Sequence, residues 1–94
     1  MVEKEFLLNK GMLEPKSRDI ISFLEEKIDN NIIKDFLINY IAGEEGIAYE
    51  FLCSEIYASK IKLSKDIFFL IKEECLQYEV KEFYWQDLEK LIID

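Results

Sequence analysis

The spacing of apolar residues along the chain predicts helices. Apolar residues recur three and four positions apart through most of the sequence, which places them on one face of an α-helix. Signals for strands are scarce, because the chain has three Gly, one Pro and neither Asn-Gly nor Asp-Gly. We therefore expect an all-α fold, a compact bundle of about five short amphipathic helices whose neighbours pack antiparallel.

Capping residues set the bounds of the first two predicted helices. Ser17 is expected to cap a helix over about 17–28. One of the asparagines at 30–31 is expected to cap the next helix, which ends at Gly43 because glycine readily takes the left-handed conformation that follows a helix. Residues 1–13 come before these helices and fit either a short helix or a packed arm.

Three further helices are predicted in the second half of the chain. The third begins at Glu44 and ends around 59–60, and the fourth is capped by Ser64 and ends at about residue 79. Residues 61–63 alternate between apolar and polar and alone would suit a short strand, and residues 81–84 are expected to form a turn. The last helix is expected to carry the apolar residues Trp85, Leu88, Leu91 and Ile92.

The chain is expected to form a single domain over residues 1–94, with a modest core. Half of its residues are apolar, which argues against intrinsic disorder. Three consecutive aromatic residues at 83–85 spread around most of a helix, so at least one is expected at the surface while Trp85 anchors the core. The predicted core residues are Phe23, Leu24, Phe36, Leu37, Ile41, Ala48, Phe51, Leu52, Ile67, Leu70, Ile71, Trp85 and Leu88.

The absence of histidine removes much catalytic chemistry. Without imidazole there is no Ser-His-Asp triad, no Cys-His pair and no His-ligated metal, and the carboxylates do not follow the spacing of an EF-hand. We expect no enzyme, no catalytic residue, no cofactor and no metal site. Cys53 and Cys75 stand outside any CxxC pair and are expected to be buried free thiols of a cytosolic protein, with a disulfide as the alternative.

The chain is acidic, with 12 basic and 20 acidic residues and a net charge of −8. This charge argues against binding nucleic acid or an anionic membrane and favours a basic partner. The longest apolar run, Ile67–Ile71, is too short to cross a bilayer and no secretory signal is evident, so a cytoplasmic protein is expected. The charge is uneven, because residues 35–59 and 73–94 each carry a net −5 while residues 60–72 carry +3.

The acidic segment 35–59 holds the candidate binding residues. Tyrosines interleaved with carboxylates suit an interface with a Lys- and Arg-rich protein, since a tyrosine combines an apolar ring with a polar hydroxyl. The alternative is a solvated helix face with half-buried tyrosine rings. The residues expected to contact a partner are Glu44, Glu45, Tyr49, Glu50 and Tyr57. A second acidic group lies near lysines and is expected to be solvated surface; it consists of Glu73, Glu74, Glu79 and Glu82.

Segment 43–53, which reads GEEGIAYEFLC, resembles the GE-x-G-x-A-x-E-x-L-C core of small helical immunity proteins of the MafI type. The sequence IKLS at 61–64 stands where that family tends to have a short linker before the next helix. Trp85, followed three positions later by Leu88, resembles its C-terminal closure. The resemblance extends over about 31–92 and concerns helix starts, small residues and core positions.

The resemblance implies a cytosolic antidote of a bacterial polymorphic toxin system, similar in size to those of contact-dependent growth inhibition. Such proteins bind one toxin domain, often a nuclease, and block its active site or substrate surface. The expected partner is therefore a cognate toxin domain, a basic nuclease or RNase, bound by a monomer in a 1:1 heterodimer. The alternative is a non-catalytic helical adaptor or regulatory subunit, or a homodimer, with an apolar interface.

Overall fold

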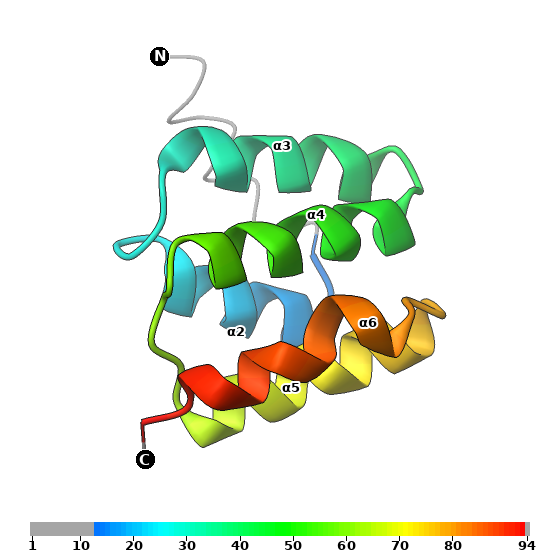
Figure 1. Ribbon diagram of the computed structural model, residues 1–94. Helices are drawn as coiled ribbons and strands as arrows, with labels where there is room; N and C mark the ends of the chain where they lie inside the picture. Colours follow the sequence, from blue (N-terminus) through cyan, green and yellow to red (C-terminus); the bar gives the residue numbers. More distant parts are fainter. Residues whose placement is uncertain (1–12, 94) are drawn as a thin grey trace.

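The computed structural model describes residues 13–93, and Figure 1 shows them as a bundle of helices. The predicted all-α fold is confirmed. In chain order the helices are α2 (Pro15–Leu24), α3 (Asn30–Ile41), α4 (Glu45–Ala58), α5 (Lys65–Gln77), α6 (Glu82–Trp85) and the 3₁₀-helix η2 (Gln86–Leu91). The short helix or arm expected over 1–13 lies outside the described residues, apart from Leu13, whose side chain is buried.

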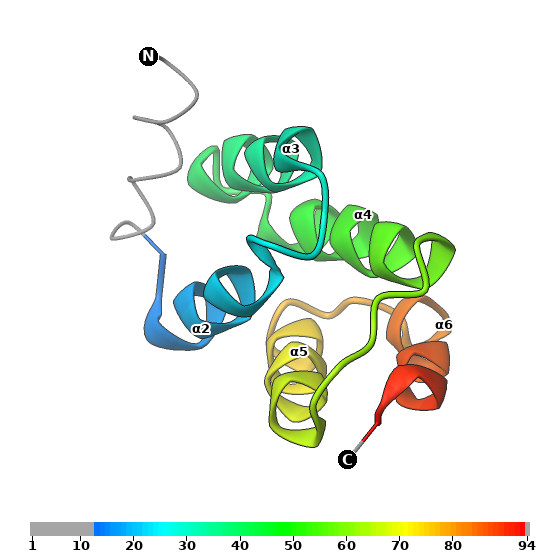
Figure 2. The same ribbon diagram turned by 90° about the vertical axis from the view of Figure 1, so that its left-hand side faces the viewer.

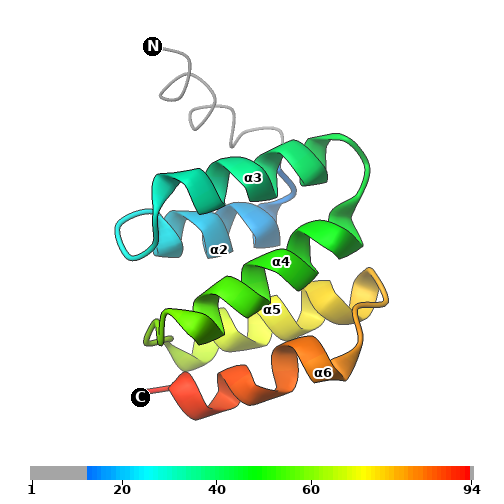
Figure 3. The same ribbon diagram turned by 45° about the horizontal axis from the view of Figure 1, so that its top comes forward.

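The helices form two layers, which Figure 2 shows nearly end-on. One layer contains α2 and α5, and the other contains α3, α4 and α6 with η2. Consecutive helices run in opposite directions, as expected, and α4 lies between α3 and α6 (Figure 1, Figure 3). Because α4 and α6 are both antiparallel to α5, they run in the same direction, and they lie side by side.

The helices α3, α4 and α5 all end in the same kind of turn. The residue after each C-cap has a positive φ, 86° at Gly43, 55° at Lys60 and 58° at Glu79. The amide that follows donates a hydrogen bond to a carbonyl five residues earlier, at 2.9, 3.2 and 2.8 Å respectively. This Schellman motif satisfies carbonyl groups that a helix end leaves free. Glycine takes the left-handed conformation at 43 without strain, so the predicted end of α3 is confirmed.

Of the predicted N-caps, one is confirmed and the others are wrong. The Ser64 hydroxyl caps α5 and accepts a hydrogen bond from the amide three residues later, at 3.2 Å. The cap of α3 is Asp29, whose carboxylate accepts from the Asn31 amide at 2.7 Å, and is neither Asn30 nor Asn31. Ser17 lies inside α2 and is buried, because α2 begins earlier, at a proline whose fixed φ suits the first turn of a helix.

Two other predicted bounds are also wrong. The first predicted helix does not continue to 28: α2 ends at Leu24, and a turn then brings Ile28 back into the core. The amide of Ile28 donates to the Leu24 carbonyl at 3.1 Å across this turn. Residues 81–84 are not a turn, because α6 begins at Glu82 and tightens into η2 after Trp85.

A β-bridge fastens the end of the chain to the connection between α4 and α5. The amide of Leu63 donates to the Leu91 carbonyl at 3.0 Å, and the amide of Ile93 donates to the Leu63 carbonyl at 3.1 Å. Leu63 and Ile92 therefore form an isolated parallel bridge. The alternation at 61–63 produces this single bridge in place of a strand.

Most of the predicted core is buried between the layers. Ile41 is the clear exception, because it lies about 90° around α3 from the centre of the buried face formed by Ile33, Phe36, Leu37 and Tyr40. The predicted residues that are only partly buried are Phe23, Phe51 and Leu70. The confirmed residues are Leu24, Phe36, Leu37, Ala48, Leu52, Ile67, Ile71, Trp85 and Leu88.

Two cysteine thiols meet inside the core. Cys53 of α4 and Cys75 of α5 are both free and buried, as expected, and their Sγ atoms are 3.8 Å apart. The hydrogen bond with Cys75, together with burial, raises the pKa of the Cys53 thiol well above its usual value. The thiol therefore stays protonated and behaves as a small apolar side chain.

A carboxylate is buried where the two layers meet. Glu74 of α5, expected at the surface, is only 1 % exposed. The Ser17 hydroxyl donates to its Oε1 atom at 2.6 Å, and the Tyr49 hydroxyl lies 2.5 Å from Ser17 Oγ and 3.4 Å from the same Oε1. Since the Ser17 proton goes to Glu74, the Tyr49 hydroxyl is left to donate to Ser17 Oγ and, at the longer distance, to Glu74 Oε1. This buried hydroxyl–carboxylate network joins α2, α4 and α5.

Replacing Ser17 by alanine should destabilise the fold, because it removes the closest hydrogen-bond donor of a buried carboxylate. We expect the free energy of unfolding to fall by about 1–3 kcal/mol in urea titrations. Ser22→Ala is the matched control, since Ser22 lies on the exposed side of the same helix. Equal stability of the two variants would contradict a structural role for the network.

Candidate functional site

The predicted binding residues do not form one patch. Glu44 is exposed and Glu45 is half-buried at the start of α4, where a negative charge complements the helix dipole. Glu50 lies about 140° around the helix from Glu45, on the same side as Tyr57. Glu50 and Tyr57 thus share one side of α4, at the edge of its buried face, and the two glutamates at its start do not.

Tyr49 is not a surface residue, which corrects the prediction. Its side chain is fully buried, with the Phe36 ring edge-on at 5.0 Å and the Tyr78 ring stacked at 6.1 Å. Burial raises the pKa of Tyr49 well above its usual value, the hydrogen bond with Ser17 opposes the shift, and the Glu74 carboxylate adds to it. The hydroxyl therefore serves the buried network and no partner reaches it in the folded chain.

The structure brings the two acidic blocks of the sequence together. Residues 44–59, which include α4, contain four acidic residues and no basic one, and residues 82–91, which include α6 and η2, contain three acidic residues and one lysine. These two segments lie side by side (Figure 3). In α2 and α5 together, by contrast, acidic and basic residues are equal in number. The two acidic segments are therefore neighbours in the fold, and we call the surface where α4 meets α6 and η2 the α4–α6 face.

A hollow of about 250 Å³ lies in this face, between α4 and the C-terminal helices. Its lining residues are Ser54, Tyr57, Phe83, Tyr84 and Asp87, and we call it the α4–α6 hollow. Phe83 is 72 % exposed and Tyr57 is 38 % exposed, and the Phe83 ring meets the Tyr84 ring edge-on at 5.0 Å. Exposed aromatic rings gathered around a carboxylate are typical of protein interfaces.

Two lysines of the chain contact residues that line this hollow, although neither lysine lines it. The Lys60 ammonium lies over the Tyr57 ring, 4.4 Å from its centre, and the Lys90 ammonium lies 3.4 Å from the Asp87 carboxylate. Both partners of the second pair are well exposed, so the pair contributes little to stability. Two residues that line the hollow therefore bind cations of the chain itself, Tyr57 through its ring and Asp87 through its carboxylate.

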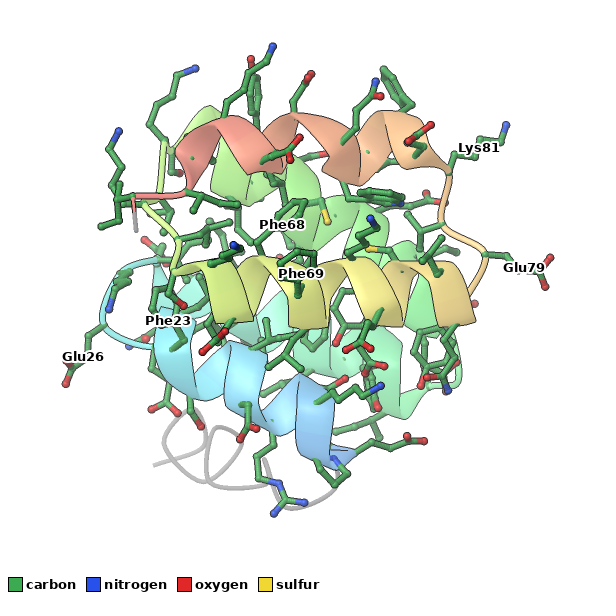
Figure 4. The ribbon with its side chains drawn as sticks, turned by 90° about the horizontal axis from the view of Figure 1, so that it is seen from below. Phe23, Glu26, Phe68, Phe69, Glu79 and Lys81 are labelled. Carbon is green, nitrogen blue, oxygen red and sulfur yellow. The ribbon has the colours of Figure 1, made fainter. Side chains whose placement is uncertain are left out.

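A second groove lies on the other side of α6 and η2. Its volume is about 380 Å³, and its apolar floor comes from Phe68, Phe69 and Trp85. Figure 4 shows Phe68 between α5 and the C-terminal helices and Phe69 in front of α5. The Lys72 ammonium covers the Trp85 ring at 5.6 Å, and charges of both signs line the rim. The groove thus has no clear charge preference, unlike the α4–α6 hollow.

The part of the site that sequence reasoning missed comes from the C-terminal helices. The aromatic residues at 83–85 gave the available signal, and the expectation that one of them is exposed is confirmed by Phe83, while Trp85 is buried as predicted. Asp87 carried no signal, because its place beside Tyr57 depends on the packing of η2 against α4.

Within residues 13–93, no three His, Cys, Asp or Glu side chains are grouped closely enough to hold a metal ion. In the same part of the chain, every helix is too short or too polar to cross a membrane. Comparison of the chain with models of protein families, with curated proteins and with solved structures finds no match. The resemblance of segment 43–53 to immunity proteins therefore stays a prediction.

The burial of Tyr49 should make the protein sensitive to alkali. The unfolded tyrosine ionises above about pH 10, while the folded one stays protonated because its pKa is raised. The stabilisation is complete below that pH, and the free energy of unfolding should fall above it by about 1.4 kcal/mol for each pH unit. Denaturant titrations from pH 8 to pH 11 measure this slope.

The difference between two variants isolates the contribution of Tyr49 to this slope. Tyr49→Phe lacks the ionisable group and should show a shallower fall than the parent protein. Tyr57→Phe, which changes the exposed tyrosine of the same helix, should keep the parent slope. Equal slopes in all three proteins would show that Tyr49 ionises as freely in the folded chain as in the unfolded one.

Proposed function

We propose that the protein is an immunity protein, which binds a cognate toxin domain and neutralises it. The single observation that supports this proposal best is the α4–α6 face, where two acidic segments meet and exposed aromatic rings surround a hollow. Such a surface suits a partner rich in lysine and arginine. A nuclease has to hold polyanionic substrate and is therefore a natural example of such a partner.

The proposed mechanism is steric and electrostatic occlusion in the cytoplasm. Carboxylates of the α4–α6 face attract the basic substrate surface of the nuclease and raise the association rate. Aromatic anchors such as Phe83 and Tyr57 then lose contact with water and slow dissociation. An interface of roughly 1,200–2,000 Å² would cover the phosphate-binding surface, so that carboxylates occupy the place of substrate phosphates.

The residues that carry the resemblance to immunity proteins serve mainly the turn before α4 and the packing of α4, and few of them could contact a partner. Gly43 takes the positive φ that ends α3, and a Cβ atom on Gly46 would lie 3.3 Å from the Tyr78 carbonyl oxygen. Ala48, Leu52 and Cys53 of the same segment are fully buried. This division suits antidotes that share a fold while each fits a different toxin.

A second candidate function, a helical adaptor or homodimer, is favoured by a different surface. Ile38 and Ile41 of α3 and Ile47 of α4 are 40–52 % exposed, near the turn that joins the two helices. Apolar side chains of this size at the surface suit a permanent apolar interface. Light scattering during size-exclusion chromatography separates the alternatives, because the antidote is expected to be a monomer and the adaptor an obligate oligomer.

Co-expression tests the proposed function directly. The C-terminal fragment of the product of the gene immediately upstream, which the proposal expects to be toxic, is expressed alone and together with this chain. Growth should be restored only in the second case, and the two proteins should co-purify in a 1:1 ratio. Continued growth arrest in the presence of the folded chain would contradict the proposal for that toxin.

Charge reversal locates the binding surface. Glu50→Lys and Asp87→Lys should each slow association with the toxin by about three- to tenfold, because they add cations to the α4–α6 face. Glu26→Lys is the control, since Glu26 points away from the bundle in the turn after α2 (Figure 4). Salt should slow association of the parent protein in the same way. Stopped-flow fluorescence measures these rates, and equal rates for all variants would place the interface elsewhere.

A further inference from the structure

We propose that the α4–α6 hollow is a receptor for one arginine side chain of the basic partner. This inference rests on the proposed function, because it names the chemical group that the acidic face receives. The three strongest features of the hollow are an aromatic face that already holds a cation, a carboxylate with an exposed and exchangeable partner, and an aromatic ring with most of its surface in water.

The Tyr57 ring is the cation-binding wall of the hollow. Lys60 lies at the end of α4, and its ammonium sits 4.4 Å above the ring centre. This contact shows that the Tyr57 ring can hold a positive charge. A cation over an exposed ring gains only about 0.5–1 kcal/mol, so an incoming guanidinium can replace the lysine.

Asp87 supplies the charge at the other side of the hollow. Its carboxylate is paired with Lys90 one turn along η2, at 3.4 Å, and both residues also line the groove beside Phe69. The lysine forms a single contact and both groups are exposed, whereas a guanidinium can donate two parallel hydrogen bonds to one carboxylate. Arginine is therefore the cation that gains most from exchange with Lys90.

The Phe83 ring would contact the apolar methylene groups of an arginine side chain. Phe83 is 72 % exposed and its ring meets the Tyr84 ring at a steep angle, which leaves apolar surface for the methylene stem of an incoming residue. The Ser54 hydroxyl also lines the hollow, although it donates to the Glu50 carbonyl at 3.0 Å, and its oxygen can still accept from a guanidinium. The hollow thus combines the apolar, aromatic and anionic groups that an arginine side chain can contact.

The test uses the whole protein and a probe without any toxin. N-acetyl-L-arginine amide is titrated into the ¹⁵N-labelled chain, and amide shifts are followed by NMR. The shifts should change, in a saturable manner, around Ser54, Tyr57, Tyr84 and Asp87. N-acetyl-L-citrulline amide, which has the same shape without the charge, should bind at least about fivefold more weakly. Equal binding of the two probes, or shifts confined to the groove beside Phe69, would overturn the proposal.

Two pairs of matched variants test the walls separately. Asp87→Asn should weaken arginine binding by about three- to tenfold, and the control Glu26→Gln, a similar charge change in the distant α2–α3 turn, should leave it unchanged. Lys60→Gln should strengthen binding of the arginine probe by about two- to fivefold, because it removes the lysine that covers the Tyr57 ring. Lys81→Gln removes the same charge before α6 and should have less effect (Figure 4). Equal effects of the two lysine changes would exclude the ring from the site.

The outcome for arginine is separate from the outcome for the toxin. Growth rescue without localised arginine binding would overturn the receptor and leave the proposed function standing. Localised arginine binding without growth rescue would overturn the antidote proposal for the toxin tested and leave the receptor standing.

Discussion

The burial of the Glu74 carboxylate is the constraint on which the arrangement of the helices depends. A charge removed from water is costly unless hydrogen bonds replace the lost solvent, and here the donors are hydroxyl groups from α2 and α4. Apolar packing alone would let the two layers slide by small amounts, whereas three polar groups must meet within hydrogen-bond distance. This requirement fixes α2, α4 and α5 relative to one another. The rotation of α4 about its axis is then set, and Tyr57 is turned toward α6.

The local features of the fold could be predicted because their causes lie within a few residues. Gly43 and Ser64 act through the backbone of their own turns, and both predictions are confirmed. Ser17 looked like the same kind of signal, but its hydroxyl partners are distant in sequence, so a residue typical of a cap became a core donor. Tyr49 was misassigned for the same reason, since its partners come from α2, α3 and α5.

Helical spacing predicts that Glu74 is buried, but its charge argued more strongly for a place at the surface. It lies three positions after Ile71 and seven after Ile67, which are buried positions of α5, so helical spacing alone would place it inside. Its neighbour Glu73, 100° around the helix, is exposed and pairs with Lys16 at 3.7 Å. Because both residues are glutamates, the sequence alone led to the same expectation for both, a place at the solvated surface. Likewise, only the α4 half of the candidate site could be recognised in the sequence. The second acidic block becomes a neighbour of α4 only because α6 and η2, which follow α5 in the chain, pack against α4.

The bridge between Leu63 and Ile92 helps to keep α6 and η2 against α4, and the α4–α6 hollow exists only while they are packed there. The bridge holds the last residues of the chain against a connection far earlier in the sequence, with two backbone hydrogen bonds and the buried side chains of Leu88 and Leu91. Closing so long a loop costs entropy, and short elements are where partial opening of a folded protein is least costly. Opening this segment would carry Phe83 and Asp87 away from α4 and dismantle the hollow while the rest of the bundle stays folded. A partner that binds α4 and the α6–η2 segment together would therefore slow hydrogen exchange in that segment. Binding of the partner and closing of the segment would then be thermodynamically coupled.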